Sequence, residues 1–158
     1  MTPSFRHVLS ALAALFLGLS VANAETHTIT FDNQCGRGTP TLIVDGKVVS
    51  TGAPYTSTGT ISGIAYLQTG ECLFNGENCS LLEMTLTNPA SGCIGCGSSA
   101  DISLIAPHKF NVVSGYSFYN GCDGQGHTCA SATCKDAFFQ PNDNQVQTGC
   151  QADNRCVG

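Results

Sequence analysis

Apolar and β-branched residues occur in short runs in this chain. After residue 24 no segment shows a sustained apolar repeat of 3.6 residues, which an amphipathic helix would require. Gly, Ser, Thr and Asn separate the runs at intervals typical of two-sheet β proteins. We therefore expect strands in seven segments: 27–31, 41–49, 60–67, 81–86, 102–105, 110–113 and 116–119.

The second of these runs contains a hairpin signal. Asp45-Gly46 lies between two apolar stretches, and such a pair favours a type I′ turn because both central residues need positive φ. The part after Gly121 differs from the rest, since it is polar and rich in cysteine, and we expect it to be looped and held by disulfides. The pattern as a whole predicts an all-β domain of two packed antiparallel sheets.

The start of the chain has the pattern of a secretory leader. Arg6 and His7 precede the apolar run 8–21, and Ala22-Asn23-Ala24 supplies small residues for cleavage. A run of about 14 residues is too short to span a membrane, which takes roughly 20. We expect residues 1–24 to be a signal peptide and residues 25–158 to form one secreted domain.

The charge and the cysteine content narrow the possible kinds of protein further. The chain has six Lys and Arg against eleven Asp and Glu, a formal net charge of −5, and the leader would remove one of the cations. Such a charge argues against electrostatic binding to nucleic acid or an anionic membrane. All ten cysteines follow residue 24, and a dense, even set in a small secreted domain indicates a disulfide framework.

One pair of cysteines, Cys93 and Cys96, has the spacing Cys-x-x-Cys. We interpret it as a structural disulfide. A zinc site would need a second pair of ligands, and a redox site would need a strand–turn–helix unit around one thiolate. Neither accompanies this pair, although both remain alternatives to the structural bridge.

Several stretches, in order, resemble the thaumatin-like family, especially its small ten-cysteine members. They are ITFDNQC at 29–35, LLEMTL at 81–86, DISLI at 101–105 followed by FNV at 110–112, and CKDAFFQPND at 134–143. Two further cysteines close the chain as they do in the family. The resemblance implies a flattened antiparallel β-sandwich with disulfide-stapled loops, lacking the large helical second domain of full-length members.

The resemblance also implies disulfide pairs by position. Cys72–Cys79 would close a hairpin loop, and the remaining Cys93 and Cys96 would pair with each other, where the sequence departs from the family. A swap to Cys72–Cys96 with Cys79–Cys93 stays open. The other pairs carried over by position are Cys35–Cys156, Cys122–Cys150 and Cys129–Cys134.

Many thaumatin-like proteins have an acidic cleft, and some bind or slowly hydrolyse fungal β-1,3-glucan. Glu83 and Asp101 carry over by position to two of the cleft acids. Glu83 interrupts an apolar strand, and Asp101 begins the next one. A catalytic pair needs one protonated and one ionised carboxyl group, and both must face one groove. The ordinary interpretation is a solvent-facing Glu and an Asp at a strand start, and the cleft arginine of the family is missing, since no Lys or Arg lies between Lys47 and Lys109.

The remaining candidate residues are fewer. Trp is absent, so Tyr66, Tyr116 and Tyr119 are the aromatic candidates for stacking on a sugar. Asn78 begins the sequence Asn-Cys-Ser, which is a formal N-glycosylation site. No spacing of histidines indicates a metal, and we expect no cofactor.

The sequence thus predicts a secreted monomer of the extracellular space or cell wall. We expect it to bind cell-wall β-1,3-glucan, with weak endo-β-1,3-glucanase activity less expected than binding alone. The alternative is a non-catalytic defence, antifungal or effector protein that acts through protein contacts. We expect neither nucleic acid nor membrane as a partner.

Overall fold

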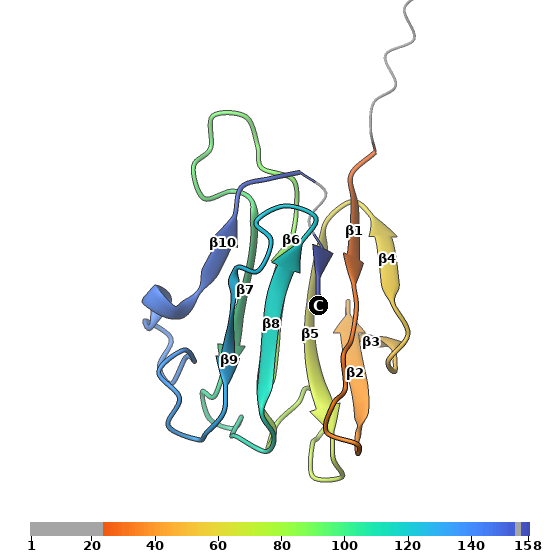
Figure 1. The fold of residues 1–158 in the computed structure, drawn as a ribbon, viewed down its shortest axis with the longest axis vertical. Helices are drawn as coiled ribbons and strands as arrows, with labels where there is room; N and C mark the ends of the chain where they lie inside the picture. Colours follow the sequence, from red (N-terminus) through yellow and green to blue (C-terminus); the bar gives the residue numbers. More distant parts are fainter. Residues whose placement is uncertain (1–23, 154–155) are drawn as a thin grey trace, which may run out of the picture.

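Two β-sheets packed face to face form the molecule (Figure 1). The computed structural model describes residues 24–153 and 156–158, without the side chain of Cys156. The predicted signal peptide lies outside the described residues, apart from Ala24. None of the helices in the described part is long and apolar enough to cross a membrane.

The five-stranded sheet lies in front in Figure 1. β1 and β11 run parallel, whereas the other strand pairs of the described chain are antiparallel. Its strands in spatial order are β4 (Tyr55–Thr58), β1 (Thr26–Ile29), β11 (Cys156–Val157), β8 (Ser114–Tyr119) and β9 (Gly126–Cys129).

The six-stranded sheet lies behind it and carries the candidate site on its outer face. One turn of 3-10 helix, η1 (Asn144–Val146), precedes β10. The strands in spatial order are β10 (Thr148–Cys150), β7 (Ser98–Ser103), β6 (Leu81–Leu86), β5 (Ile61–Gln68), β2 (Thr39–Val44) and β3 (Lys47–Ser50).

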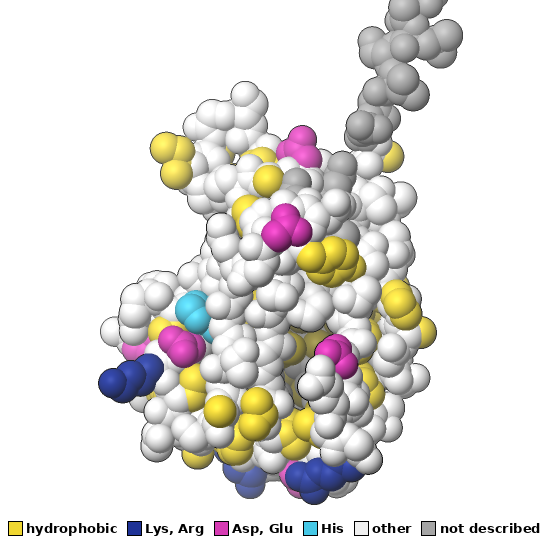
Figure 2. Space-filling model, in the orientation of Figure 1, with side chains coloured by type: hydrophobic (Ala, Val, Ile, Leu, Met, Phe, Trp, Pro, Cys, Tyr) yellow, Lys and Arg dark blue, Asp and Glu magenta, His cyan; other side chains and the backbone are white. Residues whose placement is uncertain are grey.

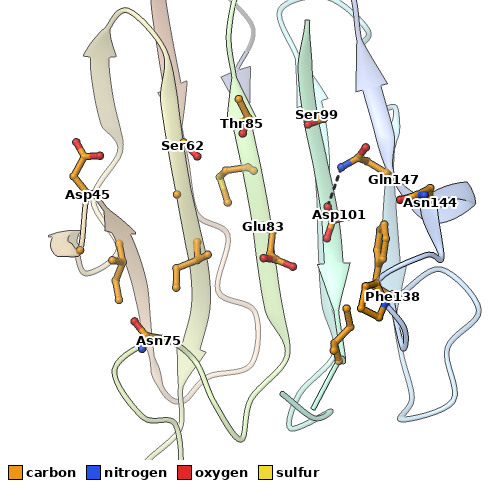
Figure 3. A pocket seen from close by; sticks show the side chains of 17 residues that line it. Asp45, Ser62, Asn75, Glu83, Thr85, Ser99, Asp101, Phe138, Asn144 and Gln147 are labelled. Carbon is orange, nitrogen blue, oxygen red and sulfur yellow. Dashed lines mark hydrogen bonds between the residues drawn. The ribbon is translucent and has the colours of Figure 1, made fainter. Parts of the chain in front are cut away.

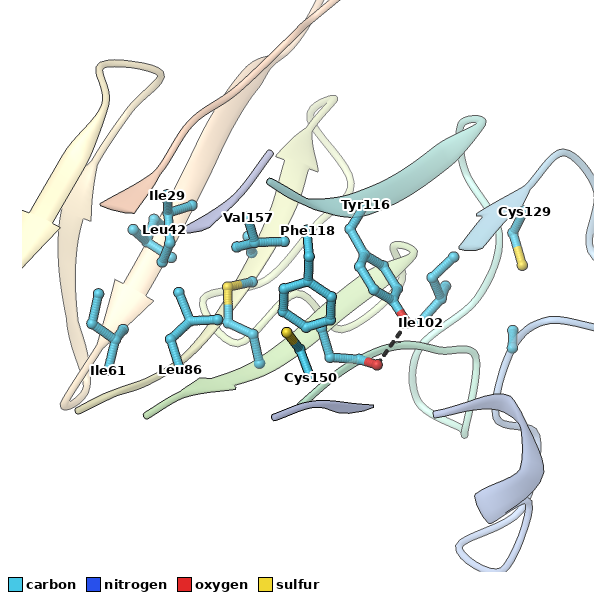
Figure 4. Close-up of a cluster of buried hydrophobic side chains, with 14 of the residues drawn as sticks. Ile29, Leu42, Ile61, Leu86, Ile102, Tyr116, Phe118, Cys129, Cys150 and Val157 are labelled. Carbon is cyan, nitrogen blue, oxygen red and sulfur yellow. Dashed lines mark hydrogen bonds between the residues drawn. The ribbon is translucent and has the colours of Figure 1, made fainter. Parts of the chain in front are cut away.

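The main hydrophobic core fills the space between the sheets (Figure 4). Alternate residues of each strand point inward because successive side chains of a strand lie on opposite faces. The fully buried Phe118 ring lies near the middle of this layer. The six-stranded sheet contributes Leu42, Ile61, Met84, Leu86 and Ile102, and the five-stranded sheet contributes Ile29, Tyr116, Phe118 and Val157.

A second, smaller core lies on the outer face of the six-stranded sheet. Residues 69–80 fold back over Tyr66 and Leu81, and the Tyr66 hydroxyl donates to the carbonyl of Phe74 at 2.9 Å. Gly76 has φ +77°, and a Cβ there would lie 2.6 Å from Leu81 Cδ1. The loop can therefore pack this closely only with glycine at that position.

Most of the predicted strands are confirmed. The predicted segment 81–86 has the same first and last residues as β6. The Asp45-Gly46 turn joins β2 to β3, and the two residues have φ of 51° and 68°, as a type I′ turn requires. β7 begins four residues before the predicted 102–105, because its small polar residues pair with β6 and β10.

The predicted strand 110–113 is wrong. Asn111 ties this segment to its surroundings instead: its Oδ1 accepts from the Ser80 amide at 2.9 Å, and its Nδ2 donates to Thr69 Oγ1 at 2.9 Å. The side-chain hydrogen bonds take the place of a ladder, and Val112 alone of the segment is buried.

The prediction of a loop-only region after Gly121 is also wrong in part. β9, β10 and β11 come from it and add strands to both sheets. Ala137 and Cys150 belong to the main core, so this region is held by packing as well as by bridges.

The structure contains four of the five predicted disulfides, and the alternative swap is excluded. Cys35 is exposed and bonds to none of the cysteines whose side chains are described. Its predicted partner, Cys156, lies outside them, so this bridge stays a prediction. The four pairs are Cys72–Cys79, Cys93–Cys96, Cys122–Cys150 and Cys129–Cys134.

Candidate functional site

An open groove of about 580 Å³ crosses the outer face of the six-stranded sheet (Figure 3). Its floor is made by β2, β5, β6 and β7. The β2–β3 turn bounds one end with Asp45, the loop over the second core contributes Asn75, and the segment around η1 contributes Asn144 and Gln147.

Strand register brings Glu83 and Asp101 together in this groove. The two residues are direct cross-strand partners in β6 and β7, so their side chains emerge on the same face. Figure 3 shows both carboxyl groups in the middle of the groove. The same row continues through Ile64 and Ile43, which form an apolar strip beside the acids.

The environment of Asp101 differs from that of an ordinary surface carboxyl group. Asp101 is only 7% exposed, and burial, with a smaller contribution from the nearby Glu83 carboxylate, raises its pKa to about 6. Gln147 Nε2 donates to Asp101 Oδ2 at 3.3 Å, and this hydrogen bond opposes the shift in pKa. No Lys, Arg or His belongs to the described groove lining, so no cation compensates the pair.

A row of small hydroxyl side chains lies beside the acids. Ser62, Thr85 and Ser99 are cross-strand partners in β5, β6 and β7, one same-face position along from the row of Glu83. None of the three hydroxyl groups hydrogen-bonds to another described side chain or to backbone, so all three can bond to a ligand. Free hydroxyls, amides and carboxylates over a shallow floor suit a ligand with many hydroxyl groups.

The pair can in principle perform acid–base chemistry. Directly opposite residues on adjacent strands have Cβ atoms about 4.5–5.5 Å apart. Side chains placed in this way can approach each other, as the two carboxyl groups of a glycosidase pair must. Asp101, with its raised pKa, suits the acid, and Glu83 supplies the second carboxyl group of the pair. In the described part of the chain, no three His, Cys, Asp or Glu side chains cluster as they would around a metal ion.

The structure does not bring the three candidate tyrosines into this groove. Tyr66 lies on the same sheet face but beneath the 69–80 loop. Tyr116 and Tyr119 belong to β8 of the other sheet. Tyr116 is buried, and its hydroxyl donates to the Ala100 carbonyl at 2.6 Å and lies 2.9 Å from Thr148 Oγ1. None of the three tyrosines is therefore placed to contact a sugar bound in the groove.

The possible glycosylation site lies in the loop over the second core. Asn78 is half-buried, and its Nδ2 donates to the Glu71 carbonyl at 3.4 Å. Ser80 is buried, and Cys79 between them is bridged to Cys72. Glycosylation of Asn78 stays a prediction.

Sequence reasoning missed much of the groove. Ser62, Thr85 and Ser99 could have been found, because each lies two positions from a groove residue of its own strand and so shares its face. Gln147, Asn144 and Asn75 come from loops and one turn of 3-10 helix, whose positions no periodicity reveals.

The fold and groove define a small disulfide-bridged β-sandwich with an acidic site on one sheet. The chain is 30% identical to thaumatin-like pathogenesis-related protein 4 of Avena sativa, in an alignment that covers 88% of this chain and 90% of that protein. The chain therefore belongs to the thaumatin-like family, as the resemblance predicted. No family model matches it. No solved structure matches it either.

Proposed function

We propose that this protein is a secreted defence protein that binds β-1,3-glucan in the groove on its six-stranded sheet. The observation that carries the proposal is the pairing of Glu83 with Asp101 in an open groove with free hydroxyl groups. The name of its oat relative, a pathogenesis-related protein, supports the defence role. Four disulfides support a secretory route, since such bridges persist in oxidising compartments.

Binding would use two kinds of contact. Sugar hydroxyls would donate to Glu83 and Asp101 and exchange hydrogen bonds with Ser62 and Thr85. The less polar face of a glucose ring would lie on the strip formed by Ile64 and its neighbour Ile43. Hydrogen bonds to a charged acceptor contribute about 1.5–3 kcal/mol each, so the acid pair should dominate affinity.

Slow hydrolysis is the second candidate, and the raised pKa of Asp101 favours it. Asp101 would protonate the glycosidic oxygen, and Glu83 would act as nucleophile or base. The described lining of the groove has no cation, and its one aromatic ring, Phe138, is only 7% exposed, so little holds and distorts a sugar ring and we place binding ahead of hydrolysis.

The test is a paired assay on insoluble β-1,3-glucan, with cellulose as the competing β-1,4 polymer. It scores protein pulled down and reducing ends released, for wild type and for Glu83→Gln. Glu71→Gln is the matched control, because Glu71 is exposed and lies outside the groove lining.

We expect retention on β-1,3-glucan, about tenfold weaker in Glu83→Gln and unchanged in Glu71→Gln. Release of reducing ends that disappears in Glu83→Gln would establish hydrolysis as well. Equal retention of wild type and Glu83→Gln, or no retention at all, would refute the groove as a glucan site.

A further inference from the structure

The loop between β6 and β7, residues 87–97, stands away from both sheets. Figure 1 shows it, in green, beyond the ends of the two strands that it joins, and Figure 2 shows the same loop standing clear of the body of the sandwich. None of its residues belongs to the groove lining or to either hydrophobic core. The loop nevertheless contains a disulfide, Cys93–Cys96, whose use neither the groove nor the core explains.

The base of this loop is fixed to the sandwich, whereas its tip is not. At the base, the Thr87 amide donates to Ser98 Oγ at 3.0 Å, and the Ser98 hydroxyl donates to the Thr87 carbonyl at 3.1 Å. In the tip, the Cys93 amide donates to the Ala90 carbonyl at 3.0 Å, a bond within the tip itself, and a Cβ at Gly95 would meet no atom within 4 Å. Opening the bridge would therefore leave the base, and the register of β6 with β7, in place.

Exposure distinguishes Cys93–Cys96 from the other three bridges of the described chain. Cys96 is exposed and Cys93 is half-buried, and Ile94 between them is fully exposed. The cysteines of the other bridges all belong to a hydrophobic core or pack against one, and each of those bridges has at least one cysteine that is buried. An exposed disulfide is open to attack by a thiolate, which makes it labile, whereas a buried one is protected.

The size of the ring that the bridge closes also indicates a small structural contribution. Cys93 and Cys96 are separated by 3 positions, against 28 for Cys122 and Cys150. A bridge that closes a short loop restricts the unfolded chain less than one that closes a long loop. The fold thus gains less from this bridge than from Cys122–Cys150, and its reduction should leave the sandwich folded.

We propose that Cys93–Cys96 is a thiol–disulfide exchange site, which accepts two electrons from a dithiol outside the chain. The attacking thiolate belongs to the dithiol, so the site does not need the helix that activates a thiolate in strand–turn–helix redox motifs. The site goes beyond glucan binding and does not depend on it, because no residue of the loop lines the groove.

The exchange proceeds in two steps. Cys96 is the more exposed of the two cysteines, so a thiolate of the donor attacks its Sγ. The Cys93–Cys96 bond breaks, a mixed disulfide forms on Cys96, and Cys93 leaves as a thiolate. The second thiolate of the donor then attacks the donor sulfur of the mixed disulfide and releases Cys96. The donor becomes a disulfide, and its two thiol protons pass to Cys93 and Cys96.

Ile94 bears on the kind of dithiol that serves as donor. Its apolar side chain is fully exposed between the two cysteines. A protein that carries the dithiol could remove this side chain from water as it docks, which is favourable, whereas a small dithiol offers no surface for that purpose. The two sources share the same exchange chemistry, and the experiments below distinguish them.

The first test is limited reduction of the oxidised, folded protein with dithiothreitol, followed by alkylation and mass mapping of the cysteines of the four described bridges. Cys93 and Cys96 should be labelled about tenfold faster than Cys129 and Cys134 or more. Cys129–Cys134 is the matched control, because its separation is also short, 5 positions, but Cys129 is buried. Labelling of the control bridge, or of another described bridge, as early as Cys93–Cys96 would overturn the proposal.

The second test uses thioredoxin as the dithiol protein. A thioredoxin variant that keeps only its attacking cysteine should be trapped as a mixed disulfide on Cys96, and an adduct on Cys93, or none, would contradict the mechanism. Ile94→Ser should slow reduction by intact thioredoxin about threefold or more and leave reduction by dithiothreitol unchanged. Equal rates of Ile94→Ser and wild type with both donors would assign the site to small dithiols.

The third test separates an exchange site from a structural bridge. Replacing both Cys93 and Cys96 by Ser should lower Tm by no more than about 3 °C and leave glucan retention as in wild type. Replacing both Cys122 and Cys150 by Ser should lower Tm further. A larger loss of Tm in the Cys93 and Cys96 variant would show that the bridge holds the fold and would contradict the proposal.

Discussion

The buried carboxyl group of Asp101 lowers the stability of the fold when it is ionised, and the same burial raises its pKa toward the range of a catalytic acid. It is buried on a strand whose neighbour carries Glu83, and neither acid has a cation beside it in the described groove. An uncompensated buried charge lowers the stability of the folded state whenever the group is ionised. Such groups with raised pKa values are found at functional sites more often than elsewhere.

Asp101→Asn should reveal this as a pH-dependent gain in stability. The pKa of Asp101 is about 6 in the folded protein against 3.8 in the unfolded chain. Below pH 4 both states are protonated, and above pH 6 both are ionised, so the folded state loses stability as pH rises between these values. Relative to wild type, Asp101→Asn should gain on the order of 2–3 kcal/mol between pH 4 and pH 8, measured by denaturant unfolding.

Glu83→Gln is the companion variant for that measurement. Removing the Glu83 charge takes away one cause of the raised pKa, so the pH window of Asp101 should move downward. A difference between Asp101→Asn and wild type that does not change with pH would contradict the burial argument.

Tyr116 is a second residue whose contribution to stability can be tested, and it lies inside the core. Its hydroxyl crosses from the five-stranded sheet to the Ala100 carbonyl and Thr148 of the other sheet. Tyr116→Phe should lower the free energy of unfolding by about 1–3 kcal/mol, because buried acceptors lose their donor. Tyr55→Phe, at a half-buried site on β4 with no described hydroxyl partner, is the control and should change stability little. Equal effects of the two substitutions would show that the hydrogen bond from the Tyr116 hydroxyl to the other sheet does not contribute to the free energy of unfolding.

Among the elements, the β2–β3 hairpin is the one whose turn chemistry can be tested in isolation. Gly46 has φ +68°, and a Cβ there would meet no atom within 4 Å. Gly46→Ala should therefore destabilise the protein only through backbone strain, by about 1–2 kcal/mol. Thermal unfolding would measure this, with Gly149→Ala as the comparison, since the nearest atom there is 3.9 Å away and φ is not positive. A neutral Gly46→Ala would mean that the turn relaxes to another type.

The elements also show what the sequence could and could not predict. Strand 81–86 and the Asp45-Gly46 turn follow from alternation and turn chemistry alone. The short strands β9, β10 and β11 carry too few apolar residues to be recognised, because each gains its place from neighbours rather than from its own pattern. The segment 110–113 has a strand-like composition, but the hydrogen bonds of Asn111 hold it outside both sheets.

The same contrast applies to the site. That Glu83 and Asp101 share a groove depends on the register of β6 against β7, which no single strand pattern determines; only the family resemblance indicated it. Aromatic faces make the tyrosines candidates for sugar stacking, but the positions of these rings depend on the loop over the second core and on the opposite sheet. Gln147 could not be found, because its contact with Asp101 spans 46 residues.

For the whole molecule, the groove and the main core lie on opposite faces of the six-stranded sheet. The outer face of this sheet carries the acidic groove, and its inner face packs against the five-stranded sheet through the main hydrophobic core.

The most direct test of the central claim is a titration of the ¹⁵N-labelled protein with a β-1,3-linked glucose hexasaccharide. The account predicts resonance shifts that concentrate at Thr85, Glu83, Asp101 and Gln147, are absent with a β-1,4-linked hexasaccharide, and are lost in Glu83→Gln. Shifts that avoid the groove, or that are the same for both oligosaccharides, would contradict it.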